Sequence, residues 1–252
     1  MFTQERYSKI IQAINITGMV SVSDLVKKLK TSESTIRRDL TILDKQGLIK
    51  KVHGGAVSID NESSKNDHKV EMRKCINTDQ KSRIAHYAAS IVNDGDIIYI
   101  DAGTTTERMI DFLNAKDITV VTNGIRQAQK LIAKNIRTFI LGGEIKCITE
   151  AVVGDKAIEE LRKFNFSKGF FGVNGVTNEN GYTTPDINEA MVKKAALESC
   201  TKPFVLADES KIEKTSFVTF AEIDKAVLIT NKINDNNNII YDTSVIEVEK
   251  ND

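Results

Sequence analysis

Apolar residues recur with the period of an α-helix in three successive stretches near the start of the chain. The three stripes comprise Tyr7, Ile10, Ile11 and Ile14; Val22, Leu25, Val26 and Leu29; and Ile36, Leu40 and Leu43. Each stripe would occupy one face of a short amphipathic helix. Ser21 or Ser23 can cap the second helix and Ser32 the third, and Gly47 follows the end of the third. The pattern predicts a helix-turn-helix.

A β-hairpin is predicted directly after the third helix. Residues 48–52 form one apolar and basic run, residues 53–55 are a His-Gly-Gly turn, and residues 56–59 can return as a second strand. A hairpin at this place is typical of the wing of a winged helix-turn-helix. We therefore assign residues 1–58 to a winged helix-turn-helix DNA-binding domain.

The pattern changes after the polar residues 60–68, which read as part of a linker over residues 59–74. From about Asp79, short apolar strands alternate with amphipathic helices, which predicts an α/β domain with a mainly parallel sheet over residues 75–252. Strands are expected at 97–101, 118–122, 138–141, 169–173, 203–207, 226–230 and near 239–241. Helices are expected at 80–92, 105–113, 124–134, 156–163 and 188–199.

Charge divides the chain where the pattern changes. The whole chain has 35 Lys+Arg and 35 Asp+Glu residues. Residues 1–58 hold ten basic and five acidic residues, a net charge of +5. The other residues hold 25 basic and 30 acidic ones, a net charge of −5. A basic head suits nucleic acid. Three widely spaced cysteines and three scattered histidines argue against a disulfide framework or a structural metal, and no cofactor is expected. With no membrane-spanning apolar run or signal-peptide core, a cytoplasmic location is expected.

The third helix carries the candidate DNA contacts. Its apolar stripe leaves polar and basic side chains on the outer, N-terminal half, where a recognition helix meets bases and phosphates. The wing adds basic or flexible positions. The predicted DNA-binding residues are Ser34, Thr35, Arg37, Arg38, Lys51, His53 and Gly54. The alternative is a plain three-helix bundle in which the two arginines pair with Glu33 and Asp39.

Small polar residues follow several predicted strands of the second domain. Asp101 ends one strand and leads into Gly103 and three threonines at a helix start, where backbone N–H groups can bind phosphate. In an open parallel sheet such strand ends line one crevice. The ligand-binding residues predicted from these strand ends are Asp101, Gly103, Thr104, Thr105, Thr106, Thr122, Asn123, Asn174 and Lys211. The alternatives are that the threonines only cap the helix and that Lys211 is a solvated lysine, and Glu189 with Lys193 is expected to be a surface ion pair.

Both halves resemble the DeoR family of bacterial transcriptional regulators. The head resembles it in residues 35–40, Leu43, Gly47 and residues 53–56, and the body in the strand-end residues of 101–211. The resemblance implies a sensor domain with the fold of ribose-5-phosphate isomerases and CoA transferases, which binds a phosphorylated sugar. It also implies that the phosphate lies on residues 103–106 and that Thr122, Asn123, Glu189 and Lys211 surround the sugar. Residues 172–175 and 181–186 look closest to the branch that regulates fructose or lactose phosphotransferase operons. Fructose-1-phosphate or tagatose-6-phosphate is the effector this branch implies.

Three functions are compatible with these patterns. The first is a regulator, expected to be a repressor, whose homo-oligomer (a dimer or a tetramer) binds operator DNA and responds to the sugar phosphate. The second is a sugar-phosphate isomerase with an appended head, for which Glu189 and Lys211 fit the catalytic positions while Asn174 and Thr177 stand where isomerases carry acids. The third is a scaffold that only oligomerises the head. The incomplete catalytic set favours the regulator.

Overall fold

The computed structural model describes residues 2–17, 19–52, 54–58, 77–231 and 244–248. These residues form two compact units, an N-terminal head that ends at Ser58 and an α/β domain that begins at Thr78. The predicted linker, residues 59–74, lies outside the described residues, and so do His53 and the strand expected near residues 239–241. Each unit is treated by itself.

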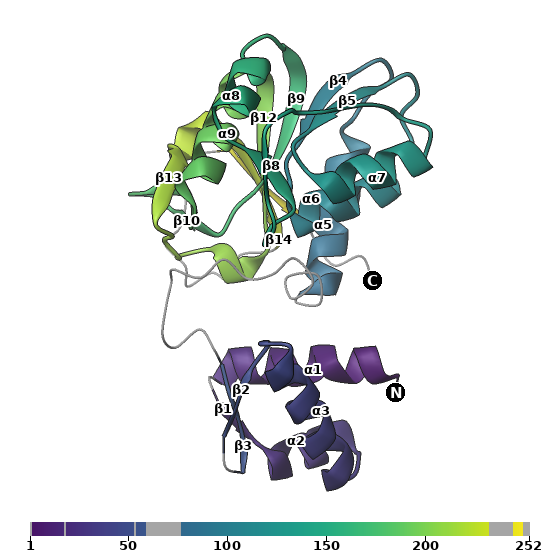
Figure 1. Cartoon of the computed structure of the whole chain (residues 1–252), viewed down its shortest axis with the longest axis vertical. Helices are drawn as coiled ribbons and strands as arrows, with labels where there is room; N and C mark the ends of the chain where they lie inside the picture. Colours follow the sequence, from purple (N-terminus) through teal and green to yellow (C-terminus); the bar gives the residue numbers. More distant parts are fainter. Residues whose placement is uncertain (1, 18, 53, 59–76, 232–243, 249–252) are drawn as a thin grey trace. The chain divides into compact units, whose positions relative to one another are not determined.

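The head is a winged helix-turn-helix (Figure 1). Its elements are α1 (Thr3–Thr17), β1 (Met19–Ser21), α2 (Val22–Leu29), α3 (Glu33–Lys45), β2 (Lys50–Val52) and β3 (Gly55–Val57). The Ser21 and Ser32 hydroxyls cap α2 and α3, as the sequence predicts. The three apolar stripes meet in one core that includes Ile14, Leu25 and Leu40.

The wing has one more strand than the hairpin predicted from the sequence. β1 pairs antiparallel with β3, which gives the sheet order β1-β3-β2. Three residues are too few to show alternation, so the sequence carried no signal for β1. A Cβ on Gly55 would lie 2.3 Å from the Val20 carbonyl oxygen, so only glycine fits where these strands cross.

The α/β domain is built on a parallel seven-stranded sheet in the order β15-β14-β12-β9-β4-β5-β6. The strands are β4 (Ile97–Ile100), β5 (Thr119–Thr122), β6 (Arg137–Ile140), β9 (Phe166–Gly172), β12 (Cys200–Ala207), β14 (Val227–Asn231) and β15 (Val245–Val248). Six of the strands predicted from the apolar runs are present within a few residues of their expected bounds. This order places β9 at the centre and β4 between β9 and β5.

Helices cover both faces of the sheet (Figure 1). The elements are α5 (Thr78–Ser90), α6 (Thr104–Phe112), α7 (Ile125–Ala133), α8 (Asp155–Leu161) and α9 (Ile187–Glu198). Residues of α5, α6 and α7 share one apolar core with Ile98 and Ile100, while residues of α8 and α9 share a second core with Tyr99. Successive residues of β4 thus point into opposite layers, as a strand buried on both faces requires.

Two small sheets complete the domain and were not predicted. One is β10 (Gly175–Thr177), β11 (Gly181–Thr184) and β13 (Val218–Ala221); the other is the hairpin of β7 (Glu144–Lys146) and β8 (Ala151–Val153). Their strands have three or four residues each, so periodicity does not reveal them. The hairpin of β7 and β8 brings residues 146–150 beside the end of β5, because the Val152 N–H donates to the Asn123 carbonyl at 2.7 Å.

Candidate functional site

The N-terminal half of α3 presents a polar surface. The Thr35 N–H donates to the Ser32 hydroxyl at 3.3 Å, which fixes the helix start, and the Ser34 hydroxyl lies 3.0 Å from the same oxygen. Ser34 is exposed and Thr35 half-buried, so both hydroxyls can reach a phosphate beside the helix N-terminus. Ile36 faces the core and is fully buried.

Arg37 and Arg38 are both exposed on α3. The Arg37 guanidinium donates to the Glu33 carboxylate at 2.6 Å one turn earlier, and both side chains are more than half exposed. An exposed ion pair of this kind contributes little free energy, so Arg37 can exchange Glu33 for a phosphate or a base. Half of the alternative bundle interpretation is therefore present, in a form that does not exclude DNA binding.

The other half of that interpretation is wrong. Asp39 does not pair with Arg37 or Arg38, because it is fully buried and accepts both bonds of the Arg6 guanidinium, at 2.5 and 3.2 Å. The hydrogen bond to Asp39 raises the pKa of Arg6. This pair links α1 to α3 inside the head, so its role is to hold the recognition helix in place.

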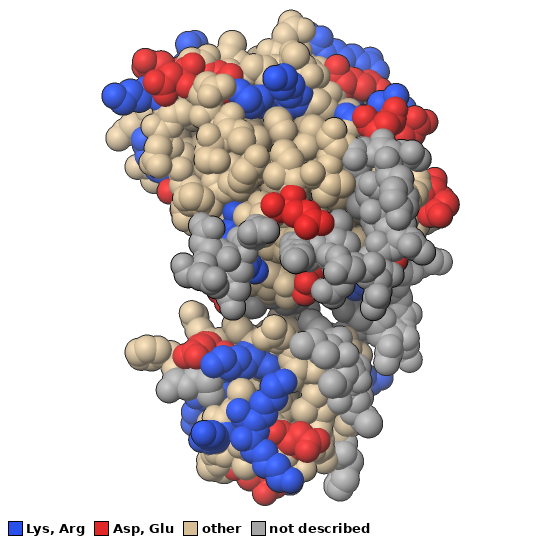
Figure 2. All heavy atoms as spheres, turned by 180° about the vertical axis from the view of Figure 1, so that it is seen from behind, with Lys and Arg blue, Asp and Glu red and all other residues tan. Residues whose placement is uncertain are grey.

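Basic side chains gather in a band on one face of the head (Figure 2). In the wing, the exposed Lys51 donates from its Nζ to the Thr41 hydroxyl of α3 at 2.7 Å. Gly54 is exposed with φ +84°, a conformation that favours glycine at a hairpin tip. The bond between Lys51 and Thr41 thus joins the wing to α3, and both elements contribute basic side chains to the head.

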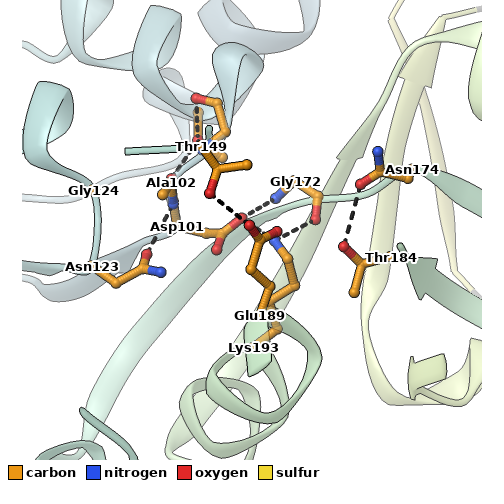
Figure 3. A network of polar contacts seen from close by, with 12 residues as sticks. Asp101, Ala102, Asn123, Gly124, Thr149, Gly172, Asn174, Thr184, Glu189 and Lys193 are labelled. Atoms are coloured by element: carbon orange, nitrogen blue, oxygen red, sulfur yellow. Dashed lines mark hydrogen bonds and ion pairs between the residues drawn. The ribbon is translucent and has the colours of Figure 1, made fainter. Parts of the chain in front are cut away.

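The second site lies at the carboxyl ends of the central strands (Figure 3). Asp101 follows β4 and is buried, and its carboxylate accepts from the Gly172 N–H at 3.0 Å and from the Lys193 ammonium. Lys193 also donates to the Gly172 carbonyl at 3.0 Å. β4, β9 and α9 are therefore joined by one buried ion pair at the end of the sheet.

The expected surface ion pair between Glu189 and Lys193 is wrong. Both side chains are buried, and they bond in different directions. Glu189 accepts from the Thr149 hydroxyl at 2.6 Å and from the Lys146 ammonium at 3.1 Å, whereas Lys193 holds Asp101. Helical spacing predicted a shared face, but it could not show that this face packs against the sheet end.

Asp186 extends the same network. Its carboxylate accepts from the Glu189 N–H at 2.9 Å, which caps α9, and it lies 3.2 Å from the Lys146 ammonium. Burial alone would raise the pKa of Asp186, but these hydrogen bonds and the lysine charge outweigh it, so the pKa is lowered. Lys146 thus connects the loop of the β7–β8 hairpin to the first turn of α9.

The three threonines at the start of α6 have different surroundings. Thr106 is fully buried, and its hydroxyl bonds to the backbone of Asp101 and Gly103, which closes the helix cap. Thr105 is also buried. Thr104 is half-buried, and its hydroxyl accepts from the buried Lys81 ammonium at 3.3 Å. The capping alternative therefore describes Thr106, while Thr104 is the hydroxyl nearest to a cation.

A shallow hollow adjoins this helix start, and the space that it encloses holds about one water molecule. It is lined by Ala102, Gly103, Thr104, Glu107, Arg126, Gln127, Thr149 and Glu150. The Arg126 guanidinium makes two bonds to the Glu150 carboxylate, at 2.5 and 2.8 Å. The lining therefore carries one guanidinium that is already paired with Glu150, and a second carboxylate, Glu107, beside the backbone N–H groups of the helix start.

The remaining predicted ligand residues lie at neighbouring strand ends. The Asn123 side-chain oxygen accepts from the Ala102 N–H at 2.9 Å, and the buried Thr122 hydroxyl donates to the Ile100 carbonyl at 2.6 Å. The half-buried Asn174 accepts from the Thr184 hydroxyl at 3.4 Å. Lys211 is half-buried in the short helix η2 (Glu209–Lys211) after β12.

Two family models match this chain. Residues 6–62 match the DeoR-like helix-turn-helix domain, and residues 76–232 match the DeoR C terminal sensor domain. The chain belongs to the DeoR family of transcriptional regulators. It is 43% identical over 231 residues to a Bacillus subtilis protein described as the uncharacterized HTH-type transcriptional regulator FruR, with 91% of each chain covered. It is 32% identical to the lactose phosphotransferase system repressor of Staphylococcus aureus, with 98% of this chain and 99% of that protein covered.

Solved structures add only a general likeness of fold to the family assignment. Ribose 5-phosphate isomerase A of Methanocaldococcus jannaschii aligns over 54% of this chain and 55% of that one, with a TM-score of 0.40 and 17% identity. The sorbitol operon regulator SorC of Klebsiella pneumoniae covers 84% and 90%, with a TM-score of 0.37 and 10% identity. Similarities this low carry no argument about function.

DeoR-family membership decides between the regulator and the enzyme. The relatives matched over most of their length are transcriptional regulators, and the helix-turn-helix is a DNA-binding domain. The chain is therefore a DNA-binding transcriptional regulator, not an isomerase. Among the helices of the described ranges, none is long and apolar enough to cross a membrane.

Five polar residues of the sensor domain contribute to the site without having been predicted. They are Lys81, Arg126, Lys146, Thr149 and Lys193. None follows a strand of the main sheet, so the rule about strand ends did not find them. Lys81, Arg126 and Lys193 lie on helices, and Lys146 and Thr149 lie on the β7–β8 hairpin. Lys193 had been assigned to the surface. The only available signal was its spacing of one turn from Glu189.

Proposed function

We propose that this DeoR-family chain represses an operon for sugar uptake or catabolism, and that a phosphorylated sugar relieves the repression. The head binds operator DNA through α3 in the major groove and through the wing. The α/β domain binds the sugar phosphate at the carboxyl ends of β4, β5 and β9. Fructose-1-phosphate and tagatose-6-phosphate are the preferred effectors, since the relatives with repressor names include lactose phosphotransferase system repressors.

The DNA part of the proposal is supported by the exposed arginines of α3. An arginine that pairs with guanine through two hydrogen bonds contributes about 1–3 kcal/mol of discrimination against other bases. Arg38 is exposed, and Arg37 makes only an exposed ion pair. The buried pair of Arg6 and Asp39 fixes the helix that carries them, so the arginines are presented from a rigid element.

The ligand part rests on one observation, the hollow beside the first turn of α6. The sensor domain brings Lys81 and Arg126 to this helix start from α5 and α7, next to Gly103 and Thr104. A phosphate placed there meets N–H groups at the positive end of a helix and the Lys81 ammonium, and it competes with Glu150 for the Arg126 guanidinium. The sugar hydroxyls would then lie towards Asn174, Glu189 and Lys211, where carboxylate, amide and ammonium groups can bond to them.

Operator binding can be tested on the full chain with DNA selected from a random pool. We expect Arg38→Ala to weaken binding about five- to 150-fold, the range that corresponds to about 1–3 kcal/mol. Arg37→Ala should also weaken it. Lys9→Ala removes an equal charge from α1, where Lys9 pairs with Glu5, and should change affinity little. Fluorescence anisotropy that gives wild-type affinity for both arginine variants would refute the assignment of α3.

Effector binding can be tested by thermal denaturation with fructose-1-phosphate, tagatose-6-phosphate, ribose-5-phosphate, fructose and inorganic phosphate. A ligand at 100 times its dissociation constant stabilises the folded state by about 2.7 kcal/mol, so the melting temperature must rise. Thr104→Asp places a negative charge in the hollow and should abolish the shift. Thr201→Asp adds the same charge at the exposed amino end of β12 and should retain it. No shift with any sugar phosphate would favour a scaffold that binds nothing small.

A further inference from the structure

One edge of the main sheet has an unpaired strand. β6 is the last strand in the order and pairs only with β5. The Leu141 N–H donates to the Thr122 carbonyl at 3.0 Å. Backbone N–H and C=O groups of alternate residues face the same neighbouring strand, so those of the residue before Leu141, and of every second residue before that one, face away from β5. The N–H and C=O groups of Thr138 and Ile140 therefore face outward, and within the described ranges no partner is recorded for either N–H.

This edge is also apolar. Phe139 is 43% and Ile140 47% exposed, and both lie on the outermost strand. Proteins usually protect an open edge with charges, proline or a bulge, since it would otherwise pair with another strand. Of the ten large hydrophobic side chains exposed in the described part of the chain, five lie between residues 132 and 148. They are Ile132, Phe139, Ile140, Ile145 and Ile148.

We propose that β6 pairs antiparallel with β6 of a second copy of this chain across a two-fold axis. This inference goes beyond the function proposed above, because it assigns the surface through which the regulator associates. In the register centred on Phe139, Thr138 of one copy faces Ile140 of the other. Both outward residues of each strand then form hydrogen-bonded pairs, which gives four N–H to C=O bonds.

The same register brings the two Phe139 side chains together and keeps the two Arg137 side chains apart. The two Phe139 side chains meet in the non-hydrogen-bonded pair on the axis, where aromatic side chains pack closely. The Arg137 guanidinium lies 5.4 Å from the Phe139 ring of its own strand. Arg137 faces position 141 of the other copy, so the two guanidinium groups are kept apart by several residues.

Pairing of β6 with the same strand of a second copy gives a closed dimer. If β6 instead paired with the opposite edge strand, β15, each added copy would expose a new edge, and the result would be a ring of several copies or an open filament, not a dimer. Pairing of β6 with itself uses one surface on both copies and leaves no new edge. A two-fold dimer also supplies two heads, which a single small head domain needs in order to read two half-sites.

The β7–β8 hairpin connects this surface to the polar network. Ile145 and Ile148 are exposed on it, whereas Lys146 and Thr149 of the same hairpin bond to Glu189. An effector that changes the bonds of Glu189 would therefore act on the hairpin, which follows β6 directly in the chain. This link rests on the proposed ligand site, but the self-association of β6 does not and is tested without any ligand.

The first test measures the mass of the full chain by light scattering over a range of concentrations. Phe139→Glu should raise the dissociation constant of the β6 dimer about 30-fold or more, as for a central interface residue. Phe217→Glu, at a side chain 70% exposed elsewhere, should leave it unchanged. Circular dichroism identifies any variant that is unfolded. A wild-type chain that is monomeric at all concentrations, or Phe139→Glu with wild-type mass, overturns the proposal.

The second test examines the register and does not depend on a destabilising charge. Antiparallel residues in a non-hydrogen-bonded pair have Cα atoms about 4.5 Å apart, within the range of a disulfide. Phe139→Cys should therefore cross-link two copies under mild oxidation in a Cys147→Ser background, which removes an exposed cysteine. Thr138→Cys, which faces Ile140, should not. Cross-linking of Thr138→Cys but not Phe139→Cys overturns the register.

Discussion

Removal of the buried ammonium of Lys193 is the most demanding test of the sensor-domain architecture. The Lys193 side chain is 7% exposed and that of Asp101 is 2% exposed. In Lys193→Met, a side chain of similar length fills the space, but the Asp101 carboxylate keeps only the Gly172 N–H as its donor. The Gly172 carbonyl also loses the bond that Lys193 gave it. The variant therefore leaves an uncompensated charge at the end of β4.

The expected loss follows from that geometry. Breaking a buried ion pair by removal of one partner costs about 3–5 kcal/mol of unfolding free energy. For a domain of this size, 1 kcal/mol corresponds to about 2–4 °C, so the melting temperature should fall by roughly 6–20 °C. Replacement of both partners, in Asp101→Asn with Lys193→Met, should cost less than the sum of the single changes by about 0.5–3 kcal/mol.

Urea denaturation followed by far-ultraviolet circular dichroism measures these values, since the chain has no tryptophan. Lys194→Met is the matched control, because Lys194 is the next residue of α9 and is exposed. Its effect should stay within about 0.5 kcal/mol. A loss below 1 kcal/mol for Lys193→Met, or additive single changes, would show that the ion pair does not hold β4 to α9.

Three further outcomes are expected. Asp39→Asn weakens the bonds to a buried arginine and should destabilise the head by about 3 kcal/mol, which a separate urea transition or hydrogen exchange of α3 detects. Burial alone would raise the pKa of Asp96, but Lys168 and the other donors outweigh it and lower this pKa from its ordinary value of 3.8. The wild-type chain should therefore be more stable than Asp96→Asn at any pH above 3.8. This advantage should disappear as the pH falls through the lowered pKa of the folded state. An advantage that persists in strong acid would contradict this. Burial raises the pKa of Cys200 to about 12, so iodoacetamide should label the exposed Cys147 first, as peptide mass spectrometry can show.

The sequence was most informative where one physical signal was long and regular. The apolar runs of four or more residues predicted six of the seven strands of the main sheet, all but β15, and helical spacing predicted the helices between them. The serine cap at Ser32 placed the start of α3 within one residue. The three-residue strands β1, β7 and β8 were missed because so short a segment has no measurable period.

Strand ends predicted only part of the polar network. Asp101 and Asn123 belong to it because the chain order of a parallel sheet brings such ends together, whereas Glu189 lies in the first turn of α9 and was predicted from the family resemblance. Lys193 and Lys146 could not be assigned, since their partners are 92 and 43 residues away and their burial depends on tertiary packing. A lysine carries the same letter whether it is solvated or buried, so only its surroundings distinguish the two.

The way the charges are paired explains why this site suits a sensor. A general base must take a proton from its substrate, and strong donors that hold a carboxylate favour its charged form and so weaken it as a base. Glu189 accepts from Thr149 and Lys146, and Asp101 is held by Lys193. Such carboxylates instead position cations and loops. A ligand that competes for one of these donors must rearrange the hairpin or α9. Its binding free energy is then coupled to conformation, and this coupling is what a regulator needs and an isomerase does not.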